Sequence, residues 1–382
     1  MDKVPYGRHW IDEDDIREVV RTLRSDWLTT GPEVEEFERA VAEYTGARHA
    51  VAVANGTAAL HATMFALQIG PGDEVIVPPL TFAATANCIV YQGATPVFAD
   101  VASDTLLLDP ACIALKITPR TKAIIAVDYA GQLCDYDALR GIARSHGLAL
   151  VADACHALGG TYKGRSAGSL ADLSTFSFHP VKPITTCEGG MITTDDPDLA
   201  RRVGIFRNHG ITTDHRERAQ AGAWFYEMTE LGYNYRLSDV QCALGISQLR
   251  KLPARVARRQ EIARQYDRAF ESCSAVRPLR TRAEVAHAYH LYVVSVASDP
   301  GRDKLVSALR DRGIGANVHY VPVHLHPYYR NYHHCKPGLC PVAEEAYRHI
   351  LSLPIFPQMT DADVSRVTSA VEEICAITST RT

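Results

Sequence analysis

Lys182 is the residue whose surroundings point most directly to covalent chemistry. It lies within residues 174–190, a stretch of apolar, hydroxyl and glycine residues that contains no run of charges. A structural lysine is usually solvated among other charged residues on a helix face. A desolvated lysine has a lowered pKa and becomes a nucleophilic amine that can form a Schiff base. We therefore take Lys182 as a candidate nucleophile.

Asp153 is a second candidate because it ends an apolar run, residues 149–153, that is typical of a buried strand. Burying a carboxylate is costly unless the charge is paired, and a pyridinium nitrogen would be a suitable partner. Taken alone, Asp153 can equally cap a helix, and the neighbouring His156 can be an ordinary buried histidine. The two residues indicate a functional site only in combination with others.

The turn at residues 55–60, Asn-Gly-Thr-Ala-Ala-Leu, follows the first predicted strand and opens a helix with small and hydroxyl residues. Such a turn suits anion binding at a helix N-terminus, although it also fits an ordinary strand–helix connection. Neither a Walker sequence nor G-x-G-x-x-G follows this strand. The isolated lysine, the buried acid and the turn together are the parts of a pyridoxal phosphate site: a Schiff-base lysine, a pyridinium partner and a phosphate cradle.

The elements that must position these residues alternate between short apolar or β-branched runs and helical patterns. This alternation predicts a largely parallel sheet with both faces covered, in which ligands bind beyond the carboxyl ends of the strands. Functional residues should therefore follow the strands directly. We predict strands at 49–54, 74–78, 96–100, 123–128, 149–153, 174–178 and 190–194, and helices at 57–67, 84–91, 137–146 and 198–206.

The rest of the chain has the pattern of a smaller α/β unit. Residues 215–230 are polar and irregular, and the region beyond them shows no flexible linker. At roughly 150 residues per domain, 382 residues allow two or three domains. We predict two: residues 1–251 with an N-terminal arm, and residues 252–382. In the later region we expect helices at 238–252, 254–272, 303–312 and about 360–374, and strands at 290–296 and 316–320.

Composition excludes several classes of protein. The chain is 46% hydrophobic and 22% charged with a formal net charge of −4, which fits a soluble globular protein and argues against nucleic-acid binding. We find no apolar run near the ~20 residues of a membrane helix, and residues 1–15 lack the apolar core of a signal peptide. These features predict a cytoplasmic protein without a membrane segment.

The ten cysteines are scattered, mostly among apolar neighbours, as expected for reduced buried thiols rather than a disulfide framework. One cluster, residues 333–340, contains two histidines and two cysteines. The loop between its thiols is longer than a zinc knuckle and no second pair follows, so we expect a surface loop and no metal site.

The sequence resembles the DegT/DnrJ/EryC1/StrS sugar aminotransferases, which act on nucleotide-linked keto sugars. The resemblance covers essentially the whole chain. It implies the aspartate-aminotransferase-like α/β fold: a large domain with a mostly parallel seven-stranded sheet and a small C-terminal α/β domain. The motifs that carry it are residues 25–32, 55–60, 81–87, 128–132, the stretches around Asp153 and Lys182, 232–239, 318–320 and 351–354.

The resemblance also implies roles around a pyridoxal 5'-phosphate cofactor. Lys182 would carry the cofactor and move the proton between cofactor and substrate carbon, while Asp153 would pair with the pyridinium nitrogen. Phe82 would stack on the ring face. His156 would lie beside the ring, where most of the family has glutamine and one branch has histidine.

Further roles concern the phosphate and the substrates. The resemblance implies that Thr57, Ala58 and Ser177 bind the phosphate together with Asn234 of the partner subunit, so that a homodimer shares its active sites. The residues implied in binding substrate are Tyr6, Arg236, His319 and Tyr320.

The intact Lys182 favours amino transfer over the related dehydratases, which have histidine at this position. Residues 128–131, 156–159, 178–186 and 224–228 most resemble the branch of the family that serves pseudaminic acid synthesis. That branch implies transfer from L-glutamate, through pyridoxamine phosphate, to C4 of a UDP-linked 4-keto-6-deoxy-N-acetylhexosamine. Two alternatives stay open: another nucleotide-linked keto sugar, such as dTDP-4-keto-6-deoxyglucose or a UDP-4-keto-pentose, and a non-catalytic regulator that binds the cofactor.

Overall fold

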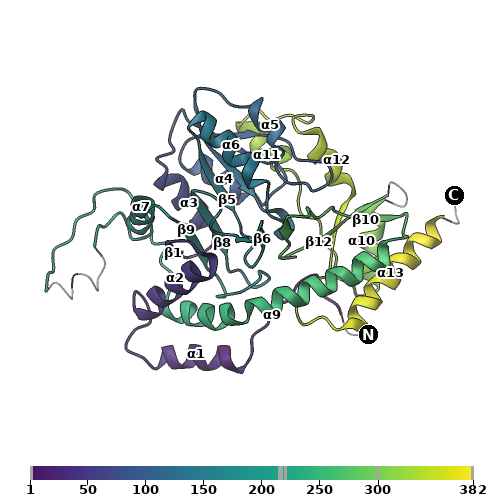
Figure 1. Cartoon of the computed structure of the whole chain (residues 1–382), viewed down its shortest axis with the longest axis horizontal. Helices are drawn as coiled ribbons and strands as arrows, with labels where there is room; N and C mark the ends of the chain where they lie inside the picture. Colours follow the sequence, from purple (N-terminus) through teal and green to yellow (C-terminus); the bar gives the residue numbers. More distant parts are fainter. Residues whose placement is uncertain (1–2, 214–217, 219–221, 298–300, 380–382) are drawn as a thin grey trace.

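The computed structural model describes residues 3–213, 218, 222–297 and 301–379. Its centre is a seven-stranded sheet in the order β1-β9-β8-β5-β4-β2-β3 (Figure 1). Only β9 runs antiparallel to its neighbours, which confirms the predicted fold class. The strands are β1 (His49–Val53), β2 (Glu74–Val77), β3 (Thr95–Phe98), β4 (Thr121–Val127), β5 (Ala149–Asp153), β8 (Leu173–Ser177) and β9 (Gly190–Thr194), close to the predicted ranges.

Helices pack against this sheet, and local signals fix their ends. Helix α3 packs on β8 and β9, and α7 packs on α3 and β1. The Asn55 side chain caps α3, and Asp196 caps α7 ahead of a proline in its first turn, a position that tolerates proline. The helices of this part are α2 (Pro32–Thr45), α3 (Gly56–Ala66), α4 (Ala84–Tyr91), α5 (Pro110–Ala114), α6 (Tyr136–His146) and α7 (Pro197–Arg207), with the 3₁₀ turn η1 (Tyr129–Gly131).

One long helix, α9 (Asp239–Phe270), replaces the two helices predicted at 238–252 and 254–272. Ser238 caps it as predicted, in a reciprocal capping box with Gln241. Pro253 lies inside the helix and removes one backbone hydrogen bond. The helix continues because α1 (Glu13–Leu23) and α2 pack along it, a tertiary effect that the local sequence does not show. The predicted domain boundary after residue 251 falls inside α9 and stays a prediction.

A second hydrophobic cluster gathers the far half of α9, the C-terminal helix and a small sheet in the order β10-β12-β13. Residues 316–320 were predicted as a strand, which is wrong: only Asn317 pairs with the sheet, opposite Ser352, and the chain then leaves it. After α9 the chain forms β10 (Val276–Pro278), β12 (Tyr292–Val296), α10 (Arg302–Asp311), η2 (Val323–Leu325), α11 (Pro327–Tyr332), α12 (Pro341–His349), β13 (Ile350–Leu353) and α13 (Asp361–Ser379); η2, α11 and α12 pack against the first hydrophobic cluster. A third sheet joins β11 (Val285–Ala286), β6 (Thr161–Tyr162) and β7 (Arg165–Ser166).

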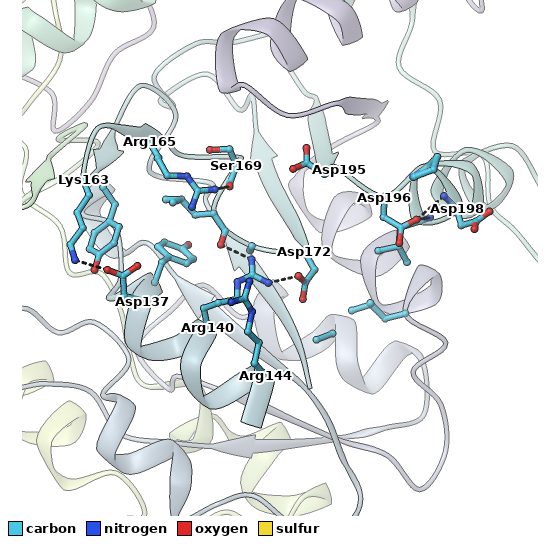
Figure 2. A pocket seen from close by; sticks show the side chains of 18 residues that line it. Asp137, Arg140, Arg144, Lys163, Arg165, Ser169, Asp172, Asp195, Asp196 and Asp198 are labelled. Carbon is cyan, nitrogen blue, oxygen red and sulfur yellow. Dashed lines mark hydrogen bonds and ion pairs between the residues drawn. The ribbon is translucent and has the colours of Figure 1, made fainter. Parts of the chain in front are cut away.

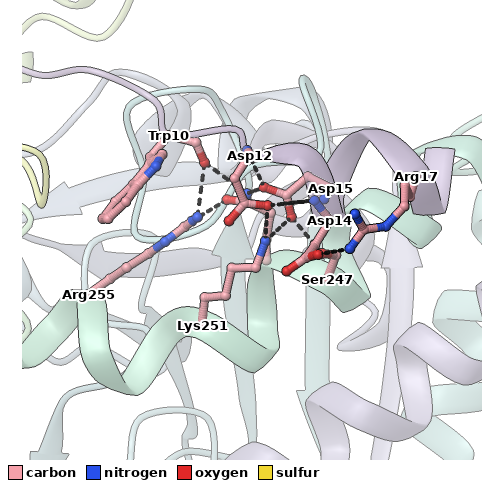
Figure 3. Close-up of polar contacts among 9 residues, drawn as sticks. Trp10, Asp12, Asp14, Asp15, Arg17, Ser247, Lys251 and Arg255 are labelled. Atoms are coloured by element: carbon pink, nitrogen blue, oxygen red, sulfur yellow. Dashed lines mark hydrogen bonds and ion pairs between the residues drawn. The ribbon is translucent and has the colours of Figure 1, made fainter.

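The N-terminal segment is fixed at two places. Val4 forms backbone hydrogen bonds of 3.0 and 2.7 Å with Gly313 and Gly315. Helix α1, which the sequence analysis did not predict, is held on α9 by a buried polar cluster (Figure 3). In this cluster the fully buried Asp15 accepts hydrogen bonds from Ser247 at 2.6 Å and from Lys251 at 2.9 Å.

Between α7 and α9 the chain extends away from the body of the protein (Figure 1). Its described part carries several exposed apolar side chains, with Trp224 84% and Leu231 75% exposed. The predicted irregular stretch 215–230 falls here, and residues 214–217 and 219–221 lie outside the described residues. Within the described chain, no helix combines the length and the apolar character needed to span a bilayer.

Candidate active site

A cavity of about 600 Å³ opens at the carboxyl ends of the parallel strands. It is lined by residues that end β4, β5 and β8 or that follow β1 and β2, as the sheet topology predicts. Nine predicted site residues face this one cavity although they come from segments far apart in the chain. They are Tyr6, Thr57, Phe82, Asp153, His156, Ser177, Lys182, His319 and Tyr320.

Asp153 is the last residue of β5, and its side chain is held by donors from two directions. The Thr85 hydroxyl donates to Oδ2 at 2.7 Å, and the Cys155 amide donates to Oδ1 at 3.3 Å. Only 6% of the residue is exposed. The structure therefore places an oriented carboxylate in the cavity wall, at the end of a strand rather than as a helix cap.

Lys182 comes from the loop between β8 and β9 and lines the same cavity. Burial lowers the pKa of its amine, while Cys155 and Asp153 oppose this shift through their charges. A lowered pKa makes the neutral, nucleophilic amine more accessible near neutral pH. The role of Lys182 as a reactive amine stays a prediction.

The start of α3 forms a narrow cradle with the end of β8. A Cβ added to Gly56 would lie 2.8 Å from Ser177 Cβ and 3.3 Å from Ser177 Oγ, so this hydroxyl sits directly at the helix N-terminus. Thr57 also lines the cavity. The first amides of a helix lack intrahelical partners and attract anions. The arrangement offers a site for a phosphate group.

Ala58 is placed differently from the prediction. Its amide donates to Asn55 Oδ1 at 2.8 Å, which is the N-cap bond of α3. Ala58 is not among the residues that line the cavity. A phosphate contact from its amide would require Asn55 to release it, so this role stays a prediction.

Histidine and tyrosine side chains also line the cavity. The Tyr320 hydroxyl lies 3.1 Å from His156 Nε2, and His319 Nδ1 lies 2.8 Å from Ser352 Oγ. Burial lowers the pKa of His319 to about 4 and that of His156 well below its usual value, and the Lys182 charge adds to both shifts. These imidazoles are therefore neutral near pH 7. This part of the lining offers neutral hydrogen-bonding groups rather than charges.

Arg236 and Asn234 are not brought to this cavity within one chain. Arg236 donates to Asn208 Oδ1 at 2.9 Å and lines a separate depression of about 220 Å³ that it shares with Arg207. Asn234 forms a bridge with Asn208 at the base of the extended segment. Their predicted roles remain predictions.

The residues that line the cavity without a predicted role include Thr81, Thr85, His290 and Asn317. The first two lie in the motif at 81–87, which gave a signal without a role. His290 and Asn317 had no local signal, because they reach the cavity only when the chain beyond α9 packs against the part that carries the central sheet.

A larger hollow lies elsewhere, between α6, β7 and the start of α7 (Figure 2). Its basic side chains are mostly engaged: Arg140 pairs with Asp172, and Lys163 pairs with Asp137. The side chains described around this hollow therefore do not form a group of unpaired residues that could act together in catalysis. In the described part of the chain, His, Cys, Asp and Glu side chains form no group of three suited to hold a metal ion.

The comparisons with known proteins identify the family of the chain. Residues 9–372 match the DegT/DnrJ/EryC1/StrS aminotransferase family. The spore coat polysaccharide biosynthesis protein SpsC of Bacillus subtilis is 44% identical over 376 residues, 97% of each chain. The putative sugar aminotransferase Spr1654 of Streptococcus pneumoniae, solved in a PMP form, has a TM-score of 0.93 at 34% identity, covering 98% of this chain and 100% of that one.

A second similar structure is PseC of Helicobacter pylori, an aminotransferase involved in the biosynthesis of pseudoaminic acid. It has a TM-score of 0.92 at 32% identity and covers 98% of this chain and 100% of its own. The chain belongs to the DegT/DnrJ/EryC1/StrS family and is a sugar aminotransferase of that family, as the sequence predicted. Several relatives are similar to about the same degree, so the pseudaminic branch is not singled out.

Proposed function

We propose that the protein uses pyridoxal 5'-phosphate to transfer an amino group from L-glutamate to C4 of a UDP-linked 4-keto-6-deoxy-N-acetylhexosamine. The observation that carries this proposal is that Lys182 and Asp153 face one cavity beside the N-terminus of α3. The structural similarity to PseC, together with residues 156–159 and 178–186, supports the choice of sugar.

The residues of the cavity fit the cofactor. When bound, pyridoxal phosphate supplies an aldehyde that carries the amino group and a ring that withdraws electrons. Ser177 and Thr57 would hold its phosphate at the start of α3, where the missing Cβ of Gly56 lets Ser177 pack closely against the helix N-terminus. Asp153 would hold the proton on the ring nitrogen. Phe82, 61% exposed, offers its ring as a stacking surface.

Lys182 has two tasks in this proposal. Its amine is the point of attachment for the cofactor, and once free it moves a proton at the reacting carbon. The lowered pKa suits both tasks, because the amine must be neutral to attack and to accept a proton. His156 and Tyr320, hydrogen-bonded to each other, would line the side of the ring.

Part of the cavity lining suits a sugar. Tyr6, Asn317 and Tyr320 present neutral donors and acceptors to the cavity, as hydroxyl and acetamido groups require. In the part of the chain that the structure describes, Lys182 is the one lysine or arginine that lines this cavity. A nucleotide diphosphate and the carboxylates of glutamate call for further cations.

We infer that a second copy of the chain completes the site. Asn234 of the partner subunit would reach the cofactor phosphate, and Arg236 of the partner subunit would face an acidic group of the substrate. The exposed apolar side chains of the extended segment, Trp224 and Leu231 among them, support a covered surface there. Sedimentation of the purified protein tests the dimer directly.

The test of function is an amino-transfer assay. The purified protein is incubated with pyridoxal phosphate, L-glutamate and a panel of UDP- and dTDP-linked 4-keto sugars, and the products are identified by NMR. We expect amination of the UDP-linked N-acetylhexosamine at C4. Lys182→Ala should abolish turnover and the visible absorbance of the bound cofactor, and Asp153→Asn should reduce turnover. Lys122→Ala, at an exposed lysine of β4, serves as the matched control.

Each result has a distinct meaning. Amination of a dTDP sugar or a UDP-4-keto-pentose alone would overturn the proposed sugar but leave the aminotransferase chemistry standing. Visible absorbance that survives Lys182→Ala unchanged would overturn the role of this lysine. Cofactor binding without transfer to any keto sugar would favour a non-catalytic regulator.

A further inference from the structure

A buried chain of two hydroxyl groups ends on the Asp153 carboxylate. Thr81 Oγ1 lies 2.7 Å from Thr85 Oγ1, and Thr85 Oγ1 donates to Asp153 Oδ2 at 2.7 Å. Thr85 is fully buried and Thr81 is 3% exposed, yet both line the cavity at one edge. These buried side chains can thus act on the site in two ways: through Asp153, or by direct contact with a bound group.

The direction of the chain follows from its end. An ionised carboxylate accepts hydrogen bonds and donates none, so the Thr85 hydroxyl must donate the hydrogen bond to Asp153. Its oxygen is then free to accept, and Thr81 must be the donor to Thr85. The two bonds are oriented alike, and hydrogen bonds in such a chain strengthen one another.

The alternative donors to Asp153 are weaker. The Cys155 amide reaches the other oxygen at 3.3 Å, which is long for a bond to a carboxylate. Burial raises the pKa of the Cys88 and Cys155 thiols, and the nearby Asp153 charge adds to both shifts. Thr85 is therefore the principal group that holds the orientation of this carboxylate.

The same helical turn also fixes the backbone of Phe82. The Thr85 amide donates to the Phe82 carbonyl at 3.1 Å, at the start of α4. One turn of chain thus connects the aromatic ring that faces the cavity with the hydroxyl that fixes Asp153. This links the residue expected above the cofactor ring with the residue expected at its nitrogen.

We propose that Thr85 is a positioning residue for amino transfer: its hydroxyl, itself oriented by Thr81, aims the Asp153 carboxylate at the ring nitrogen of the cofactor. The inference rests on the proposed function, in which Asp153 keeps that nitrogen protonated. Without the Thr85 hydroxyl the carboxylate turns toward other donors, and the ring becomes a poorer electron acceptor. Cofactor binding through Lys182 and the phosphate cradle continues.

The test compares three variants of the holoenzyme. Thr85→Val keeps the side-chain shape and removes the hydroxyl, whereas Thr85→Ser keeps the hydroxyl and removes the methyl group. Thr63→Val is the matched control, because Thr63 is also fully buried and its hydroxyl has no hydrogen-bond partner among the described residues. Measurements are the pH dependence of the visible absorbance, the single-turnover rate with glutamate and the thermal midpoint.

We expect Thr85→Val to bind the cofactor, to shift the pH midpoint of its absorbance and to slow the glutamate half-reaction about 10- to 100-fold, the loss of one hydrogen bond to a charged group. Thr85→Ser should restore most of the rate, and Thr63→Val should match the wild type. If Thr85→Val does not fold, Thr81→Val carries the test, with a smaller effect in the same direction.

Two outcomes overturn the proposal. One is wild-type rate and absorbance in Thr85→Val. The other is equal slowing in Thr85→Val and Thr85→Ser, which would assign the effect to packing of the methyl group. A wild-type protein without visible absorbance on addition of pyridoxal phosphate would be a failure of the proposed function instead, and would remove the basis for the Thr85 role as well.

Discussion

Gly190, the first residue of β9, packs directly against the turn that opens α3. A Cβ at this position would lie 2.4 Å from the Asn55 carbonyl oxygen and 3.0 Å from the Gly56 nitrogen. Ordinary van der Waals contact begins at 3.4 Å. Because the obstructing atoms are backbone, Gly190→Ala must displace the turn by about 1 Å, and overpacking of this kind costs about 1–3 kcal/mol.

The displaced turn is the proposed phosphate cradle. Asn55 caps α3 through the Ala58 amide, and Thr57 and Ser177 face the space at its start. If the whole cost falls on the cofactor-bound state, the dissociation constant for pyridoxal phosphate rises about 5- to 150-fold, since 1.4 kcal/mol corresponds to tenfold. Equilibrium dialysis measures that constant, and calorimetry of the unliganded protein measures the thermal midpoint.

Gly141→Ala on α6 is the matched control, because nothing lies within 4 Å of its added Cβ. Replacing a helical glycine with alanine should stabilise the protein by roughly 0.5–1 kcal/mol and leave the affinity for pyridoxal phosphate unchanged. The reasoning would be refuted by a Gly190→Ala protein that binds the cofactor as tightly as the wild type, whether or not its thermal midpoint has fallen.

Two further predictions concern stability. Lys251→Met leaves the buried Asp15 carboxylate without its cation (Figure 3), and the free energy of unfolding in urea should fall by about 3 kcal/mol. The control is Arg39→Ala, which breaks exposed ion pairs on α2. This variant should change the free energy of unfolding by less than about 0.5 kcal/mol. Burial raises the pKa of Asp128 from 3.8 to about 7, so the unfolded chain loses this proton first and stability falls as pH rises between these values. Asp128→Asn removes this pH-dependent loss of stability. Its free energy of unfolding relative to the wild type should therefore rise by up to about 4 kcal/mol from about pH 4 to pH 7. An equal difference in free energy of unfolding at both pH values would contradict the raised pKa of Asp128.

Much of the central sheet followed from local sequence. The strands of the central sheet were predictable because their apolar runs are bounded by turn residues, and parallel topology then placed Asp153 and Ser177 at one edge. Helix α9 was not, because packing against α1 and α2 carries the chain through Pro253. The strand expected at 316–320 failed for a related reason: only Asn317 pairs, and the chain turns toward the cavity at His319.

The sequence by itself identified the family and the residues proposed for chemistry: one isolated lysine, one strand-ending acid and one turn that suits anion binding. The tertiary structure decided which groups share a cavity. In the folded chain the Ala58 amide donates to the Asn55 side chain, and Arg236 lines another depression. The buried Thr85 hydroxyl donates to Asp153. Hydrogen-bond partners depend on distances between segments remote in sequence, and these distances exist only after the layers pack.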